Sequence, residues 1–348
     1  MGSRRSFLQS CSCPLSLFVV VVALAAPSAD GSRAARVPCY FIFGDSLYDS
    51  GNNNNLNTSV KVNYSPYGID FPAGPTGRFS NGRTAADIIG ETLGFKDFIP
   101  PFASNPDDRQ ILVGVNYASG SAGILVQSGK HLSKQLRNHK VTVSRIVKKL
   151  GSKKAAFEHL GQCLYICNMG NNDYINNYIL PQSTAIRSQY NPAQFAALLV
   201  ARYSAQIKRM YELGARKVAL AGISNIGCTP SLIATVGTNG APCVTSVNQL
   251  VAPFNIGLKS LISQLKSAHP DAKFGYLDTI RAGILASQEF KVRTTPCCQV
   301  STVTGLCLPN TVPCSQRQSY LFWDAFHPTE LANRLGAPIL LPVIQRIL

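Results

Sequence analysis

The sequence predicts an α/β protein in which a mainly parallel sheet of five strands lies between two layers of helices. Five short apolar runs recur along the chain, and the segments between them carry apolar residues at the spacing of an amphipathic helix. Apolar strands that alternate with helices are typical of a parallel sheet buried on both faces. The expected strands are residues 37–43, 111–117, 160–169, 217–223 and 274–277.

The expected helices have recognisable ends as well as helical spacing. Gly94 follows the first of them, and Asn191 with Pro192 opens another, because Asn caps a helix and Pro is tolerated in its first turn. No composition break, linker or internal repeat divides the chain, so a single domain of three layers is the simplest organisation. The expected helices are residues 83–93, a basic segment within 130–154, 191–213, 245–268 and 329–335.

Residues 1–25 are typical of a secretory signal peptide. Arg4 and Arg5 precede an apolar stretch at 15–24, and the small residues at 23–25 form a cleavage site. We therefore expect cleavage between about residues 25 and 30 and a mature domain over 26–348. The apolar stretch is too short to span a bilayer, and no later run is long enough. We expect export to the cell wall or apoplast, with the vacuole as an alternative destination.

The chain is strongly basic. Its 33 Lys and Arg residues outnumber 17 Asp and Glu residues, which gives a formal net charge of +16. The one cluster, within residues 130–154, alternates with apolar residues as the exposed face of an amphipathic helix does. No aromatic residues interleave with these charges, so we expect no nucleic-acid partner. We expect attraction to an acidic surface of wall or membrane, such as uronic-acid polysaccharide or anionic lipid.

Cysteine usage agrees with an oxidising compartment. Of the 11 cysteines, two lie in the signal peptide, and the odd number that remains leaves at least one thiol free. Cys163 and Cys167, in an expected buried strand, are the candidates for that thiol, whereas Cys228 and Cys243 bracket a loop and can pair. Disulfides are the expected state of the close set below, because a zinc site there lacks a histidine. This set is Cys297, Cys298, Cys307 and Cys314.

Two glycan acceptor sequences follow the first strand. Asn57 begins Asn-Thr-Ser and Asn63 begins Asn-Tyr-Ser, the second of them weakened by Pro66. Both lie in a polar segment rich in turn residues, which we expect to be a surface loop near the site.

Gly44-Asp45-Ser46 comes directly after the first expected strand. Glycine permits a sharp turn there, and a serine just past a strand end presents its hydroxyl at the carboxyl edge of the sheet, where open α/β sheets carry their chemistry. Because the same tripeptide also makes an ordinary turn, its interpretation depends on partners elsewhere in the chain.

A serine nucleophile needs a base and a group that orients it. Of the five histidines, His131, His139 and His159 lie in or beside the basic helical segment, where we expect them to be solvated, and His269 lies in a turn. His327 differs, because it follows an aspartate at close range.

Asp324 lies three residues before His327 and can reach one imidazole nitrogen within a single turn, while Pro328 keeps the backbone of His327 extended. The pair is therefore a candidate base and orienter, with a cap on the helix at 329–335 as the alternative. Donors for an oxyanion are expected at the ends of the next two strands, from the Gly120 N–H and the Asn172 side-chain amide, together with the backbone N–H of Ser46.

Five blocks of the sequence carry a family resemblance and together span nearly all of the mature chain: residues 43–53, 77–84, 116–124, 169–178 and 322–330. Taken together, they resemble the plant GDSL-type esterases and lipases of the SGNH hydrolase superfamily. The resemblance implies a flavodoxin-like three-layer α/β/α sandwich. It also implies that Ser46 is the nucleophile, that Gly120 and Asn172 are oxyanion donors, and that Asp324 and His327 are orienter and base.

We therefore expect a secreted serine esterase or lipase that hydrolyses carboxylic esters through an acyl-enzyme, with no metal or organic cofactor. Its substrates would be acyl lipids or acylated wall components. The alternatives are an acyltransferase of the cutin-synthase type that uses the same site, and a non-catalytic binder of lipid or wall polymer. The segment after Ile124 is shorter than is usual in such proteins, so a loop beside the site is expected to be trimmed.

Overall fold

The computed structural model describes residues 1–2, 35–180 and 184–348, so the signal peptide expected over residues 1–25 lies almost entirely outside the described residues. Residues 34–348 form one compact unit. Within the described ranges, no helix is both long and apolar enough to cross a membrane.

A parallel sheet of four short strands forms the centre of this unit. Its strands are β1 (Tyr40–Gly44), β2 (Leu164–Asn168), β3 (Lys217–Ala221) and β4 (Lys273–Leu277), and they pair in that order. All three pairings are parallel and in unbroken register. Every residue of β1 and β2 is buried, as the uninterrupted apolar runs require of strands covered on both faces.

The second expected strand, residues 111–117, is not a strand of this sheet, so the expectation of five strands is wrong and the sheet has four. Gln110–Val113 forms a single helical turn (α2), and Gly114 then turns the chain at φ 145°, where a Cβ atom would collide with the Tyr40 carbonyl. The following residues run beside β1, with the Tyr117 N–H 2.7 Å from the Ile42 carbonyl, but they form only an isolated bridge. β1 thus lies between this segment and β2, which is the strand order of flavodoxin-like sheets.

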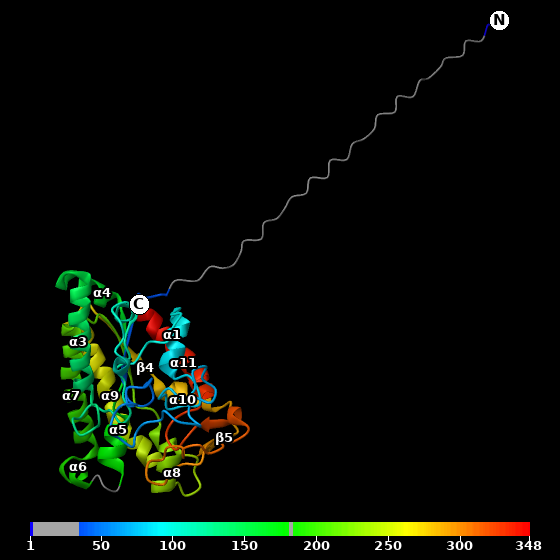
Figure 1. Ribbon diagram of the computed structural model, residues 1–348. Coiled ribbons are helices and arrows are strands. Elements are labelled where there is room, and N and C mark those ends of the chain that lie inside the picture. Colours follow the sequence, from blue (N-terminus) through cyan, green and yellow to red (C-terminus); the bar gives the residue numbers. More distant parts are fainter. Residues whose placement is uncertain (3–34, 181–183) are drawn as a thin grey trace. The chain divides into compact units, whose positions relative to one another are not determined.

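Helices cover both faces of the sheet (Figure 1). Side chains of alternate strand residues point to opposite faces, so Phe41 and Phe43 enter one core and Tyr40 and Ile42 the other. This three-layer arrangement confirms the predicted fold class. One layer contains α3 (Leu132–Leu150), α7 (Pro192–Glu212) and α9 (Thr245–Ala268), and the other contains α1 (Ala85–Leu93), α10 (Thr279–Ser287) and α11 (Glu330–Ile347).

Shorter elements connect these layers. Gly94 caps α1 in the left-handed conformation, and the Asn191 side chain caps α7, as the sequence predicts. A second, two-stranded sheet of β5 (Val292–Pro296) and β6 (Tyr320–Phe322) flanks the cysteine-rich loop. The remaining elements are η1 (Phe102–Ser104), α4 (Lys153–Gln162), α5 (Asn171–Tyr174), η2 (Ile175–Ile179), α6 (Thr184–Gln189), η3 (Ile226–Cys228), α8 (Pro230–Val236) and η4 (Arg317–Ser319).

The expectation that His139 is solvated is wrong. Its side chain is fully buried on α3, and its ring lies edge-on to Phe41 and Tyr165. His139 lies on the buried face of α3 that packs toward the sheet, on the same side as Leu136 and Val143. Burial disfavours the charged imidazole and lowers the pKa of His139 to about 3.

Four disulfides cross-link the described part of the chain. Cys228 pairs with Cys243, as expected, and the close set forms two disulfides, so the zinc alternative is wrong. Cys163 is not the free thiol, because it pairs with Cys39 at the start of β1, which leaves Cys167 free and buried in β2. The close set pairs as Cys297–Cys314 and Cys298–Cys307.

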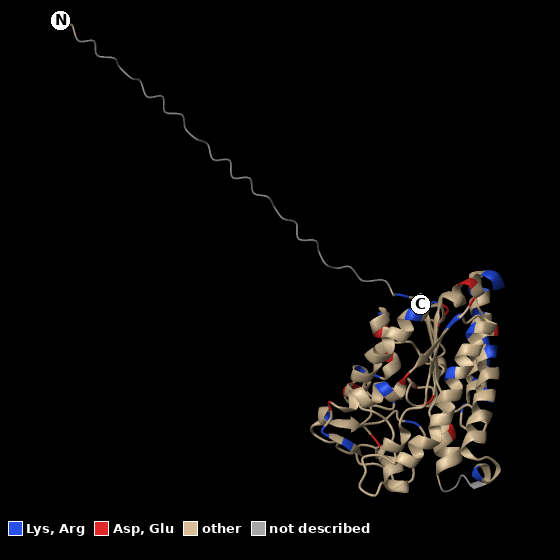
Figure 2. Ribbon diagram, turned by 180° about the vertical axis from the view of Figure 1, so that it is seen from behind, with Lys and Arg blue, Asp and Glu red and all other residues tan. Residues whose placement is uncertain are grey.

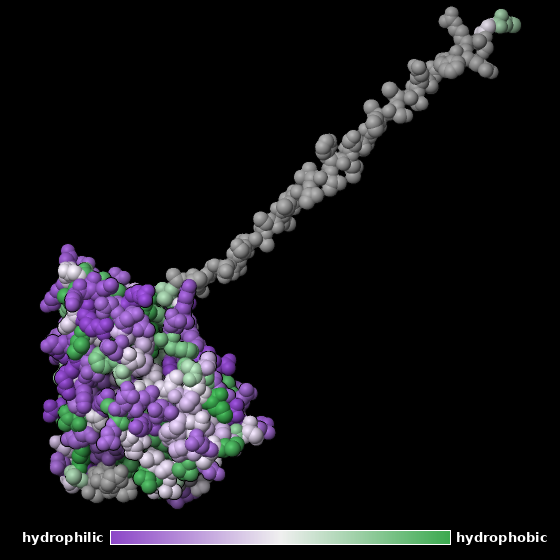
Figure 3. Space-filling view, viewed as in Figure 1, coloured by the Kyte–Doolittle hydropathy of each residue, from purple (hydrophilic) through white to green (hydrophobic). Residues whose placement is uncertain are grey.

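Basic residues are spread over both helical layers and the loops rather than gathered in one patch (Figure 2). The face seen in Figure 3 is mostly hydrophilic, with hydrophobic residues scattered singly across it. The acidic partner surface inferred from the net charge therefore remains a prediction.

Candidate active site

The serine turn begins where β1 ends at Gly44. The Asp45 carboxylate accepts hydrogen bonds from the Leu47 N–H (3.0 Å) and from the side-chain amide of Asn171 (2.9 Å), which lies just beyond the end of β2. Two strand ends are thereby tied together, and Ser46 is held at the carboxyl edge of the sheet. Burial raises the pKa of Asp45 to about 6.

The imidazole of His327 connects this serine to an aspartate. Its Nε2 atom lies 2.7 Å from Ser46 Oγ, and its Nδ1 atom lies 2.8 Å from each carboxylate oxygen of Asp324. Asp324 is fully buried and also accepts the backbone N–H groups of Phe326 and His327 at 2.8 Å. The cap of α11 is provided by Thr329, so Asp324 and His327 are not used as its cap.

Asn172 lies beside the same space, in α5 directly after β2. Its side-chain Nδ2 donates one hydrogen to the Ala122 carbonyl at 2.9 Å, and its Oδ1 accepts from Asn176. These two bonds fix the orientation of the amide, and Asn172 lines the cavity in front of Ser46.

Gly120 is placed differently from the expectation. Its N–H donates to the Asp49 carboxylate at 2.9 Å, and the residue does not line the cavity. Asp49 also accepts the backbone N–H groups of Gly51 and Asn52, so this carboxylate joins the segment after Ser46 to Gly120. Burial raises the pKa of Asp49 to about 6.

Ser121, the next residue, does line the cavity. It adopts a positive φ of 63°, which is uncommon for a residue other than glycine. The backbone N–H groups of Ser121 and Ser46 donate no hydrogen bond to any other described residue. The sequence carried no signal for choosing Ser121 over Gly120, because both lie in one run of small residues and only the backbone torsion separates them.

A cavity of about 700 Å³ opens in front of Ser46 and His327. Its lining is mostly apolar and includes residues of α10, α11, η2, η3, β6 and the loop between β5 and β6. This volume lies within the range of roughly 300–1,000 Å³ that is typical of small-molecule sites. Apolar lining residues include Ile175, Ile226, Ile280, Ile284, Phe326 and Leu340.

Within the described ranges, one group of residues has the spacing of metal ligands: Cys39, His159 and Cys163. Its two sulfur atoms are joined to each other as a disulfide, so they are not thiolate ligands. This group lies at the other end of β1 from the serine turn.

A parallel α/β sheet with contacting Ser, His and Asp side chains at its carboxyl edge is the arrangement of a serine hydrolase. Comparison with known proteins specifies the class further. Residues 40–337 match the family described as GDSL-like lipase/acylhydrolase, and the chain belongs to this family. By class it is therefore a carboxylic ester hydrolase.

Several Arabidopsis thaliana proteins are similar over most of their length. GDSL esterase/lipase At1g29670 is 46% identical over 314 residues, which cover 86% of this chain and 85% of that protein. GDSL esterase/lipase At2g19010 is 43% identical over 330 residues, or 92% of each protein. The family resemblance inferred from the sequence blocks is thus confirmed.

Proposed function

We propose that this protein is an exported serine esterase that hydrolyses acyl esters through an acyl-enzyme on Ser46. The observation that carries the proposal is the continuous set of contacts from Ser46 Oγ through the His327 ring to Asp324. In this mechanism His327 Nε2 takes the Ser46 proton as Oγ attacks the ester carbonyl carbon. Asp324 keeps Nδ1 protonated and stabilises the imidazolium that forms.

The negative charge on the carbonyl oxygen needs donors that are already in place. We assign this role to the backbone N–H groups of Ser46 and Ser121 and to the remaining side-chain N–H of Asn172. When the tetrahedral intermediate collapses, His327 returns the proton to the alcohol that leaves. Water, deprotonated by the same imidazole, then attacks the acyl-enzyme and releases the acid.

The cavity supports an acyl lipid or another ester with a sizeable apolar part as the substrate. An acetyl group would leave most of its apolar wall without contacts, whereas a longer chain removes more apolar surface from water. We therefore expect kcat/KM for p-nitrophenyl esters to rise from acetate to longer acyl chains.

The test is that chain-length series on the purified protein, with Ser46→Ala as the control. Wild type should turn over the esters and be labelled at Ser46 by a fluorophosphonate, and the variant should do neither. A folded wild type that neither reacts nor labels would favour a non-catalytic binder. A product that is mainly a new ester, when an alcohol is added as acceptor, would favour the acyltransferase alternative.

Export is supported by the signal sequence and by the disulfides. The two glycan acceptors Asn57 and Asn63 are exposed. We expect the secreted protein to begin between about residues 25 and 30 and to lose mass on treatment with a peptide N-glycosidase. An Asn57→Gln, Asn63→Gln variant should show no such loss, and unchanged mass of the wild type would contradict glycosylation.

A further inference from the structure

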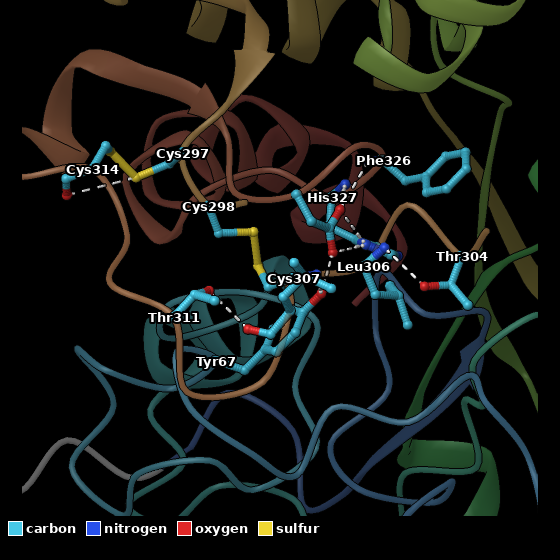
Figure 4. The surroundings of a disulfide bond; sticks show 12 residues. Tyr67, Cys297, Cys298, Thr304, Leu306, Cys307, Thr311, Cys314, Phe326 and His327 are labelled. Atoms are coloured by element: carbon cyan, nitrogen blue, oxygen red, sulfur yellow. Dashed lines mark hydrogen bonds and ion pairs between the residues drawn. A yellow bond between two sulfur atoms is a disulfide. The ribbon is translucent and has the colours of Figure 1, made fainter. Parts of the chain in front are cut away.

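Tyr67 lies directly behind the aspartate of the site. Its side chain is 1% exposed, and its hydroxyl donates to Asp324 Oδ2 at 2.7 Å. The same hydroxyl oxygen accepts the backbone N–H of Cys307 at 3.0 Å. Figure 4 shows Tyr67 between the Cys298–Cys307 disulfide and the region of His327. Tyr67 does not line the cavity in front of Ser46.

The direction of these two hydrogen bonds is fixed by chemistry. A backbone N–H can only donate, so the Cys307 N–H occupies a lone pair of the Tyr67 oxygen and leaves the phenol hydrogen for Asp324. The carboxylate is a better acceptor than any neutral group nearby. Burial and the neighbouring carboxylate raise the pKa of Tyr67 well above its usual value, so the phenol stays a donor throughout the working pH range.

The loop that holds Tyr67 is itself closed and attached to the segment that carries Asp324. A disulfide joins Cys298 to Cys307, nine positions apart. The Cys298 N–H donates to the Trp323 carbonyl at 3.1 Å, and the Ala325 N–H donates to the Gly305 carbonyl at 3.0 Å. The residues on either side of Asp324 are therefore bound to this disulfide-bonded loop.

We propose that Tyr67 is a positioning residue for ester hydrolysis, which orients the Asp324 carboxylate toward His327, and that the Cys298–Cys307 loop sets Tyr67 through the Cys307 N–H. The inference rests on the proposed roles of Ser46, His327 and Asp324. It adds a connection from the Cys298–Cys307 disulfide, through the Tyr67 hydroxyl, to the Asp324 carboxylate.

Tyr67→Phe tests the phenol while keeping the buried ring. We expect kcat to fall roughly tenfold, because a hydrogen bond to a charged group is lost, with KM changed less than twofold. The acid limb of the kcat/KM profile should move to higher pH by up to about one unit. A carboxylate with one donor fewer holds the imidazolium proton more strongly. The other titratable groups facing this pair, Tyr64 beside Asp324 and Asp45 beside His327, are unchanged.

Tyr64→Phe is the matched control. Tyr64 also binds Cys307, but its hydroxyl donates to the carbonyl at 2.9 Å rather than joining the N–H to Asp324. The Tyr64→Phe variant loses one hydrogen bond to the same loop but none to Asp324. Its kcat and the acid limb of its pH profile should therefore match wild type. Melting temperatures of both variants measure their structural cost separately.

A double-mutant cycle tests the loop. Cys298→Ser, Cys307→Ser should lower kcat by itself, and adding Tyr67→Phe to it should cost less than in wild type, since both changes act through one connection. Additive effects would overturn the role of the loop. Tyr67→Phe that folds and matches Tyr64→Phe in kcat and in pH profile would overturn the role of Tyr67. Failure of the proposed function is distinguishable, because wild type itself would then neither react nor label.

Discussion

Nε2 of His327 lies 2.7 Å from Oγ of Ser46, although the two residues are 281 positions apart in the chain. Ser46 follows the first strand of the sheet, and His327 precedes the last helix. The contact forms because α11 packs against α1 and the sheet, which places the segment just before α11 at the carboxyl edge of β1.

Asp324→Asn should lower kcat by roughly 10⁴-fold, because an amide in place of the carboxylate no longer favours the tautomer with a proton on Nδ1. The measurement is turnover of a p-nitrophenyl ester by the purified variant, beside its melting temperature. A folded variant that loses less than tenfold would contradict the assignment of Asp324 as the orienting group.

Asn172→Ala should lower kcat by roughly 10²–10³-fold with little change in KM, because the lost N–H acts on charge that develops in the transition state. Asn177→Ala is the matched control. Asn177 lies in η2, directly after the α5 helix of Asn172, donates to Ser128 Oγ at 2.8 Å and does not line the cavity. Equal losses in the two variants would point to a structural effect instead.

Ser121→Gly should keep activity within about twofold of wild type and raise stability by about 1 kcal/mol, because glycine adopts the positive φ without steric cost and keeps the N–H. Gly120→Ala should lose both activity and stability. A Cβ there would lie 2.6 Å from Asn53 Nδ2 and 2.8 Å from the Phe79 ring. A large activity loss in Ser121→Gly would show that the Ser121 hydroxyl, and not its N–H, is needed.

His139 should make the fold sensitive to acid. Burial lowers the pKa of His139 to about 3, whereas the unfolded chain keeps the ordinary value of 6.5. Below pH 6.5 the unfolded state therefore takes up a proton at His139 that the folded state does not, and the contribution of His139 to the free energy of unfolding falls as the pH falls toward 3. Between pH 6.5 and 4.5 this loss is roughly 2 kcal/mol, because the slope rises from half to nearly all of about 1.4 kcal/mol per pH unit as the unfolded histidine becomes protonated.

His139→Phe removes the pH-dependent contribution of His139 to the free energy of unfolding. Chemical denaturation of both proteins from pH 7.5 to 4.5 should show the variant gaining on wild type as the pH falls. Burial raises the pKa of Asp45, Asp49 and Asp173 to about 6, and these groups stabilise the fold as the pH falls through that value. Because both proteins share them, their effect cancels in the difference. A difference that does not change with pH would contradict the role of His139.

Local patterns were enough for most of the architecture. Continuous apolar runs predicted β1, β2, β3 and β4, and the helix ends at Gly94 and Asn191 follow from side-chain and backbone chemistry within a few residues. The run at 111–117 misled because its apolar content fits both a buried strand and a buried helical turn. Its geometry was settled by the approach of Gly114 to Tyr40.

The sequence by itself determined the fold class, the family and the identity of Ser46, Asp324, His327 and Asn172 as candidates, because each lies in a local pattern that its own neighbours explain. Only the tertiary structure decided how they meet, which cysteines pair, and that Ser121 rather than Gly120 faces the cavity. It also brought Tyr67 to Asp324. The physical reason is that these outcomes depend on distances and torsions between segments far apart in the chain, which the pattern of any one segment does not contain.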